Sequence, residues 1–266
     1  MLLIHSMENF SNFYLKILGI TKVKNICEIG SEFGGNTEIL LDYVEKNDGK
    51  LTCIDPNPDE KFRNLAYLGK INFIESMSLS SINSVDDIDA WFIDGDHNWY
   101  TVFNELVMIG KKFRENSKEL LIFVHDVDWP SGYRDMYYNP ESIPKEFLHE
   151  HSWDLGTVPD NPNLIEGGFR GNGAFAWAYV LGGEKNGVRS AINDFLIEEK
   201  GKIEFMSIPG VFGMGVLFSK EHAFYDEIKK EIEPFCCNPF LEKLEKNRLK
   251  NYLEVIRLQD QISKSR

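Results

Sequence analysis

Two groups of acidic and histidine residues each follow a short apolar stretch of this chain. Residues 94–97 read Asp-Gly-Asp-His after Trp-Phe-Ile, and His125-Asp126 follows Leu-Ile-Phe-Val about 30 residues later. Carboxylates and imidazoles in this combination can exchange protons with a substrate or hold a divalent metal ion. Because the carboxyl ends of parallel strands meet at one ligand-binding edge of a sheet, we expect the two groups to converge there.

Each of these residues also has a plain structural interpretation. A single Asp after a strand is often only a turn cap, and His125 alone would fit a buried core histidine. A functional site is favoured because five such residues follow neighbouring strands: Asp94, Asp96, His97, His125 and Asp126. We expect Asp94 and His97 to be catalytic, with His97 as the general base because imidazole titrates near neutral pH.

The residues that would bring a ligand to this edge lie near the start of the chain. An apolar run over 25–29 predicts a buried strand, the glycines between Gly30 and Gly35 predict a turn, and an amphipathic helix is expected over 36–46. Strand, glycine-rich turn and helix together are typical of α/β units that bind a nucleoside or a dinucleotide.

The glycine spacing indicates which ligand this turn accepts. The second glycine of the dinucleotide fingerprint is replaced by Ser31, and Glu28 would repel a diphosphate. Both residues weigh against an NAD(P)-dependent oxidoreductase, the first alternative. A carboxylate at the position of Glu28 suits a cationic or amine-bearing ligand.

An acidic residue ends the next predicted strand, over residues 51–55. Asp55 follows Gly35 by 20 positions, where a carboxylate can accept hydrogen bonds from both ribose hydroxyls. Its alternative role is the N-cap of a helix near Pro58, and both roles can hold together.

Taken in order, these residues resemble a known family. The pattern of Glu28, Gly30 and Gly34 resembles motif I of the class I S-adenosylmethionine (SAM) methyltransferases. The Ile-Asp-Gly-Asp-His and Val-His-Asp-Val stretches resemble a subgroup of SAM-dependent O-methyltransferases that act on sugars and natural products, similar in layout to the catechol type. The resemblance covers roughly residues 20–130.

The resemblance implies SAM as cofactor and a metal site. The implied cofactor contacts are Glu28, Gly30, Ser31, Gly34, Asp55, Ser76, Asp94 and Asp96. The implied metal ligands are Asp94, His125 and Asp126. The family more often has carboxylates or an amide where this chain has His125-Asp126, and a histidine favours Mn²⁺ or a similar ion over Mg²⁺. Without a metal, His97 or His125 would act alone, oriented by an Asp.

The expected fold is α/β, a doubly wound, mostly parallel seven-stranded sheet with a terminal antiparallel hairpin and a C-terminal helical extension. We expect a SAM-binding domain over 1–220 and the extension over 221–266. Strands are predicted at 25–30, 51–55, 71–75, 89–94, 119–127, 202–208 and 213–219. Helices are predicted at 8–19, 36–46, 59–69, 99–113, 186–199, 221–232 and 240–262.

A long excursion over residues 129–182 interrupts this pattern after the fifth strand. Much of it is irregular and rich in Pro, Gly, Asn and aromatic residues, which suits a lid or an acceptor-binding segment. We expect Tyr133 to contact a sugar-like or planar acceptor, and Arg170 to meet a phosphate or carboxylate. Plain packing at the edge of the sheet is the alternative.

Composition narrows the possible partners. The 266 residues carry a net charge of −13, which argues against a nucleic-acid substrate. The chain has no apolar run of the ~18 residues that a membrane span needs, and four cysteines do not suggest a disulfide framework, so a cytoplasmic protein is expected. The apolar stripe of 240–262 predicts a helix that packs on its own domain or forms a homo-oligomer.

The sequence therefore predicts transfer of a methyl group from SAM to an oxygen of a small-molecule or sugar-like acceptor. The second alternative is a non-catalytic subunit with the SAM-binding fold. A nucleic-acid methyltransferase is disfavoured by the charge and by the lack of an Asn/Asp-Pro-Pro-aromatic motif after the fourth strand.

Overall fold

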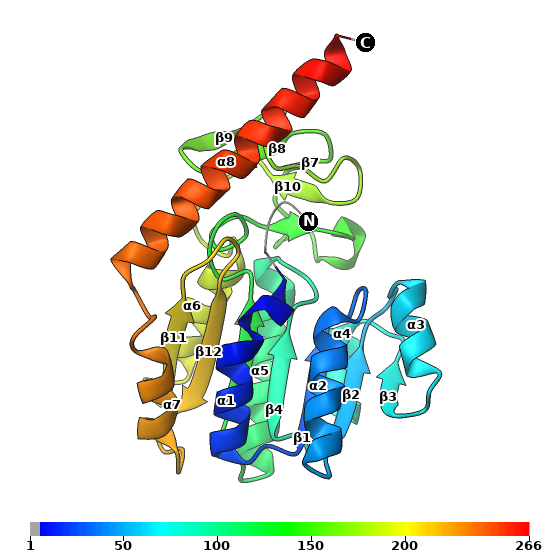
Figure 1. Cartoon of the computed structure of the whole chain (residues 1–266), viewed down its shortest axis with the longest axis vertical. Helices are drawn as coiled ribbons and strands as arrows, with labels where there is room; N and C mark the ends of the chain where they lie inside the picture. Colours follow the sequence, from blue (N-terminus) through cyan, green and yellow to red (C-terminus); the bar gives the residue numbers. More distant parts are fainter. Residues whose placement is uncertain (1–5, 266) are drawn as a thin grey trace.

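A seven-stranded sheet forms the centre of the computed structural model, which describes residues 6–265 (Figure 1). Residues 1–5 and 266, at the ends of the two expected units, lie outside the described residues. The strand order is β3-β2-β1-β4-β5-β12-β11. The strands are β1 Asn25–Ile29, β2 Lys50–Ile54, β3 Ile71–Ile74, β4 Ala90–Ile93, β5 Leu121–His125, β11 Ile203–Ile208 and β12 Met214–Ser219.

Strands β1 to β5 run parallel, and β12 is antiparallel to both β5 and β11. This confirms the expected mostly parallel sheet with a terminal antiparallel hairpin. The strand order reverses at β1, which pairs with β2 on one side and β4 on the other. Ligands of open α/β sheets bind at such a switch point, beside the carboxyl ends of the strands.

Helices cover both faces of the sheet, and its central strands are therefore almost entirely buried (Figure 1). One face packs on α1 Ser11–Thr21, α2 Gly35–Lys46, α3 Glu60–Ala66 and α7 Tyr225–Ile232. The other face packs on α5 Trp99–Glu115 and α6 Val188–Glu198. Short helical turns complete the layers: η1 Met7–Phe10, α4 Ser78–Ser81, η2 Ile82–Ser84 and η3 Pro140–Ser142.

The excursion after β5 is more regular than the sequence predicts. It forms a three-stranded sheet of β6 Met136–Tyr137, β10 Ala176–Ala178 and β7 His151–Ser152, and a hairpin of β8 Gly156–Val158 and β9 Asn161–Ile165. Both lie beyond the carboxyl ends of the large sheet (Figure 1). The buried guanidinium of Arg134 donates to the carbonyls of Pro162, Ala178 and Tyr179, so one cation ties these segments together.

The C-terminal helix α8, Pro239–Lys264, runs obliquely across the excursion, and its last turns extend past the rest of the chain (Figure 1). Leu249 is buried against Val211 and Phe212, so part of the apolar stripe packs on its own chain. Other apolar residues of α8 are exposed: Phe240, Leu244, Leu258 and Ile262. Among residues 6–265, no helix combines the length and apolarity needed to cross a membrane.

Candidate active site

The glycine-rich turn after β1 lies directly against the end of β4. A Cβ atom on Gly30 would come within 2.2 Å of the carbonyl oxygen of Asp94, and Gly30 has a φ of +83°. Only glycine tolerates both conditions. Gly34, with a φ of +79°, begins α2 as its N-cap. The turn therefore brings the start of α2 and the end of β4 to one place at the switch point.

Glu28 supports this turn from inside the protein. Its buried carboxylate accepts hydrogen bonds from Ser31 Oγ at 3.2 Å, Asn36 Nδ2 at 2.8 Å and Thr37 Oγ1 at 2.5 Å. Burial raises the pKa of Glu28 to about 7, although these donors act to lower it. The Glu28 carboxylate thus sets the conformation of the turn.

Asp55 holds the same turn from the neighbouring strand. Its Oδ2 accepts the backbone N–H groups of Ser31 at 2.8 Å and Glu32 at 3.1 Å, and its Oδ1 accepts that of Asn57 at 2.8 Å. The N-cap of α3 is Asp59, which accepts from the Lys61 N–H, so Asp55 does not fill that alternative role. Ser76, just past β3, lies at the same edge of the sheet, two residues after Ile74.

The ends of β4 and β5 bring two carboxylates and two imidazoles together, as the sequence predicts. His97 Nε2 lies 2.8 Å from Asp126 Oδ2 and 3.8 Å from Asp94 Oδ1. His125 Nδ1 lies 2.9 Å from Asp126 Oδ2 and 3.1 Å from Asp94 Oδ1. One oxygen of Asp126 is thus shared by both rings. We call Asp94, His97, His125 and Asp126 the carboxylate–histidine cluster.

The backbone at Asp126 is unusual. Its φ of +59° is in the left-handed region, which is costly for a residue with a Cβ. This conformation turns the chain at the end of β5. Observed strain of this kind is concentrated at functional sites.

Charge within the cluster favours protonated imidazoles. Burial alone would lower the pKa of His97, but Asp126 and Asp94 outweigh it and raise the pKa well above its usual range. The same balance raises the pKa of His125 to about 10. Burial alone would raise the pKa of Asp126, but the two imidazoles hold it far below its usual range. Both histidines are therefore cationic at neutral pH while no other cation is bound.

The cluster also contains donors suited to a metal ion. Asp94, His97 and Asp126 each offer a ligand atom, and these atoms lie within 4.8 Å of one another. The short contact of His97 with Asp126 is not aligned as a hydrogen bond, and neither ring nitrogen of His97 has a hydrogen-bond partner among residues 6–265. The ligand set expected from the sequence has His125 as its histidine, whereas this set has His97.

Asp96 does not join the cluster, although it lies only two residues after Asp94. Its carboxylate accepts from the His97 N–H at 3.1 Å, Asn98 Nδ2 at 2.6 Å and Thr101 Oγ1 at 2.8 Å. It therefore fixes the start of α5, and with it the backbone that carries His97.

The two predicted acceptor contacts lie outside the cluster. Tyr133 is half exposed, and its carbonyl accepts the Gly182 N–H. Arg170 makes a two-bonded ion pair with Asp260 of α8, at 3.0 and 2.6 Å, so its guanidinium is directed to the C-terminal helix.

The excursion reaches the cluster through residues that the sequence argument did not single out. The Met136 N–H donates to the His97 carbonyl at 3.1 Å, and the ring of Tyr138 lies 5.7 Å from that of His97. Phe10 and Phe212 meet the ring of His125 edge-on, at 5.9 and 6.2 Å. A strand of two residues gives no periodic signal, so Tyr138 could not be placed from the sequence.

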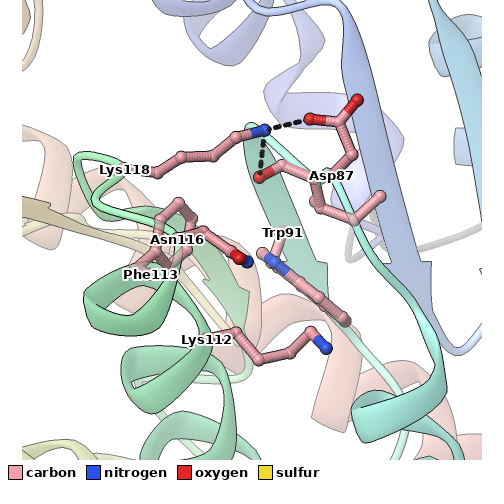
Figure 2. Close-up of a pocket in the computed structure, with 7 residues that line it drawn as sticks. Asp87, Trp91, Lys112, Phe113, Asn116 and Lys118 are labelled. Atoms are coloured by element: carbon pink, nitrogen blue, oxygen red, sulfur yellow. Dashed lines mark hydrogen bonds and ion pairs between the residues drawn. The ribbon is translucent and has the colours of Figure 1, made fainter.

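A separate small pocket lies at the opposite end of β4 (Figure 2). It holds about 10 Å³ beside Trp91 and Phe113, enough for one water at most. Its lysines are already paired: Lys112 with Asp86, and Lys118 with Asp87 and Asp89. This pocket carries no functional argument.

One family of known proteins is similar to part of the chain. Residues 27–127 match a family described as "Methyltransferase domain". These residues include the glycine-rich turn, Asp55 and the whole carboxylate–histidine cluster. No curated protein is similar enough in sequence to count as a relative.

Solved structures give more distant likenesses. An SAH-bound methyltransferase of Podospora anserina is 13% identical, with a TM-score of 0.49 over 82% of this chain and 80% of its own. The SAM-bound O-methyltransferase TomG of Streptomyces achromogenes is 14% identical, with a TM-score of 0.48 over 82% of each chain. An SAH-bound O-methyltransferase of Bacillus cereus is 14% identical, with a TM-score of 0.47 over 82% of this chain and 84% of its own.

Proposed function

We propose that the protein transfers a methyl group from SAM to an oxygen atom of a small-molecule acceptor, since residues 27–127 match a family described as "Methyltransferase domain". One observation carries the proposal. The turn held by Asp55 and the carboxylate–histidine cluster adjoin at the switch point of the sheet, because Gly30 packs against Asp94. A cofactor on the turn and an acceptor at the cluster would then be neighbours.

The proposed step is an in-line displacement. The acceptor oxygen attacks the methyl carbon, the carbon–sulfur bond breaks with its electron pair left on sulfur, and the hydroxyl proton passes to a base. Holding the two reactants in line supplies much of the rate. The carboxylates of the turn and cluster suit the positive charge of the SAM sulfonium and amine.

Without a metal, His97 is the proposed base, although the free cluster favours its protonated form. In that state the two imidazoles can donate hydrogen bonds to an acceptor oxygen, with Asp94 as the more exposed carboxylate beside them. His97 accepts a proton only after it has released its own. Asp126 orients both rings and stabilises their charge.

The donor set fits a divalent metal ion, since the ring nitrogens of His97 have no hydrogen-bond partner among the described residues and two carboxylates lie beside them. Asp94, His97 and Asp126 would hold the ion, and His125 would orient the two carboxylates through Nδ1. A bound Mg²⁺ or Mn²⁺ would supply positive charge that replaces the His97 proton and lowers the pKa of an adjacent hydroxyl. Two oxygens and one nitrogen favour Mn²⁺.

We propose two units in the chain: a catalytic unit through residue 220, which includes the excursion, and a C-terminal extension built on α8. The exposed apolar residues of α8 support a homo-oligomer contact. The net charge of −13 favours a small-molecule partner over nucleic acid. Free cysteines at positions 27, 53, 236 and 237 are in keeping with a reducing compartment such as the cytoplasm.

Calorimetric titration with SAM, SAH and NAD, each with and without Mn²⁺, tests the proposal. We expect SAM and SAH to bind and NAD not to bind. Asp55→Asn should weaken SAH binding at least tenfold, whereas Asp59→Asn, at the neighbouring N-cap of α3, should not. Binding of NAD alone would favour the oxidoreductase. SAM binding without transfer to any hydroxylated acceptor, unchanged by Asp94→Asn and His97→Ala, would favour a non-catalytic subunit.

A further inference from the structure

The outward face of α8 carries a line of residues with a symmetric spacing. The opposite face of the helix packs on its own chain, where Leu249 is buried against Phe212 and Asp260 pairs with Arg170. Four large apolar side chains on the outward face are 45–66% exposed: Phe240, Leu244, Leu258 and Ile262. Two exposed amides and one half-buried valine lie between them: Asn247, Asn251 and Val255. We call these seven residues the outer line of α8.

The outer line is straight and reads the same from either end. At about 100° per residue, each member falls within about 40° of the direction of Asn251. The successive spacings are 4, 3, 4, 4, 3 and 4 residues, so Asn251 is the centre of a palindrome. The line comprises two 11-residue repeats that share Asn251, and a repeat of this length stays nearly parallel to the axis of an α-helix.

A palindromic line is complementary to itself in the antiparallel direction. A two-fold axis at Asn251 sets residues at equal distances on either side of it opposite one another. The resulting layers are Phe240 with Ile262, Leu244 with Leu258, Asn247 with Val255, and Asn251 with Asn251 of the second copy. Each layer except the central one occurs twice, so large apolar side chains meet at both ends of the contact.

The central layer specifies the register. The amide of Asn251 has both donors and an acceptor, so two copies can satisfy each other across the axis. A shift by seven residues would instead set Asn251 against Leu258 or Leu244, and its amide would be buried without a partner, which is costly. A single polar residue within an apolar helix seam fixes register in this way.

The charges beside the outer line are complementary in the same arrangement. Lys250 and Glu254 lie on one side of the line, and pairing about Asn251 sets each against the other on the second copy. A hollow of about 420 Å³ follows this side of α8, and its lining includes three lysines: Lys243, Lys246 and Lys250. A carboxylate from a second copy would be attracted to it. Parallel pairing would instead bring Lys250 beside Arg248, a like charge.

From this spacing and these charges, we propose that two copies of the chain associate through α8 as an antiparallel helix pair with a two-fold axis at Asn251. The inference gives the homo-oligomer contact proposed above its direction and register, and it is independent of the methyl-transfer reaction. Because an interface made by one helix pair is small, the dimer dissociates on dilution.

Sedimentation equilibrium of the full chain at several concentrations measures the association. We expect a species of twice the 30.7 kDa chain mass. Leu244→Asp should raise the dissociation constant at least about tenfold, because the two-fold axis buries the new charge twice. Ile197→Asp is the matched control, since Ile197 is 74% exposed on α6, and it should leave the association unchanged. Circular dichroism shows that each variant is folded.

Cysteine cross-linking measures the direction and register, with the native cysteines of the helix junction replaced by Cys236→Ser and Cys237→Ser. For helix axes 8–10 Å apart, the two Cα atoms at position 251 would lie about 5 Å apart, which suits a disulfide. Asn251→Cys should therefore form a covalent dimer when oxidised with copper phenanthroline. Leu244→Cys should not, because its two copies would lie roughly 21 Å apart along the helices.

Charge exchange tests the pairing of Lys250 with Glu254. Lys250→Glu and Glu254→Lys should each weaken self-association, because like charges then meet across the axis. An equimolar mixture of the two variants should recover the dimer, since every changed residue meets an opposite charge on the other variant.

Three results would overturn the inference: a wild type that is monomeric at every concentration, cross-linking of Leu244→Cys equal to that of Asn251→Cys, or no recovery in the mixed charge variants. SAH affinity is measured on the same samples. Failure of the wild type to bind SAH would overturn the proposed function alone, because the helix pair does not depend on the cofactor.

Discussion

Asp135 of the excursion accepts the backbone N–H of Trp99 at 2.7 Å, and Trp99 is the first residue of α5. The same oxygen, Oδ1, accepts the N–H of Gly187 at 2.7 Å, just before α6. One buried carboxylate thus binds the starts of two helices that cover the same face of the sheet. Since His97 lies two residues before Trp99, the excursion and the loop that carries His97 share this anchor.

Asp135→Ala should lower the melting temperature by roughly 4–8 °C. Loss of one hydrogen bond costs about 1 kcal/mol, two are lost, and each kcal/mol shifts a domain of this size by about 2–4 °C. Asp135→Asn is the matched control, because its side-chain oxygen can still accept both N–H groups. A melting temperature for the Ala variant equal to that of the Asn variant would show that these two hydrogen bonds contribute nothing.

Asp55→Ala should impair SAH binding more than stability. Its carboxylate fixes the N–H groups of Ser31 and Glu32, so its loss frees the turn that we propose for the cofactor. We expect at least a tenfold rise in the SAH dissociation constant by calorimetry, with a stability loss of about 1–2 kcal/mol. An equal loss of binding in Asp59→Ala would point to general loosening of this edge.

Much of the fold was predictable because the central strands carry a strong local signal. β1, β4 and β5 read as short apolar runs, as expected for parallel strands covered on both faces. The glycine-rich turn was predictable for a similar reason, since Gly30 and Gly34 are needed where φ is positive. The apolar strands and the glycine-rich turn are both recognised from residues that are close together in the sequence.

What could not be predicted depends on distant residues or on unusual backbone conformation. The excursion is organised by Arg134 and Asp135, whose partners lie 28 to 52 residues away. Asp126, which contacts both histidines of the cluster, is a residue with a Cβ in the left-handed region. No sequence pattern marks that conformation in a non-glycine residue.

Glu105 gives a stability prediction that depends on pH. It is fully buried in α5, and burial raises its pKa to about 8 from an ordinary value of 4.5. Because the folded value lies above the unfolded one, its contribution to stability is complete below about pH 4 and is lost as pH rises toward 8. Relative to that of Glu105→Gln, the free energy of unfolding of the wild type should fall by up to about 1.4 kcal/mol per pH unit across this interval.

Urea unfolding at pH 5, 6.5 and 8 measures this difference. Glu115→Gln, at the exposed end of the same helix, serves as control and should follow the wild type at every pH. Parallel curves for the wild type and Glu105→Gln would contradict the raised pKa.

The identity of the metal ligands predicts a ranking among variants. Electron paramagnetic resonance of Mn²⁺ should show binding to the SAH-loaded wild type and none to Asp94→Asn or Asp126→Asn. His97→Ala should also abolish it, whereas His125→Gln, which keeps a donor for the carboxylates, should retain most of it. Loss of Mn²⁺ binding in His125→Gln but not in His97→Ala would favour Asp94, His125 and Asp126 as the ligands. Absence of Mn²⁺ binding to the wild type would contradict the proposed metal site.

Arg170→Ala separates two roles for that residue. Its pairing with Asp260 holds the excursion to α8 across 90 positions of sequence, so we expect faster amide exchange over residues 239–264 and no change in SAH affinity. Arg257→Ala is the matched control, since Arg257 pairs with Glu254 inside α8 at an exposed position. If Arg170 instead served the acceptor, methyl transfer would fall while exchange in α8 stayed as in the wild type. We expect the structural role, in which Arg170 holds α8 to the excursion. The ion pair is partly buried and has two hydrogen bonds, and removing one partner leaves the other charge poorly solvated.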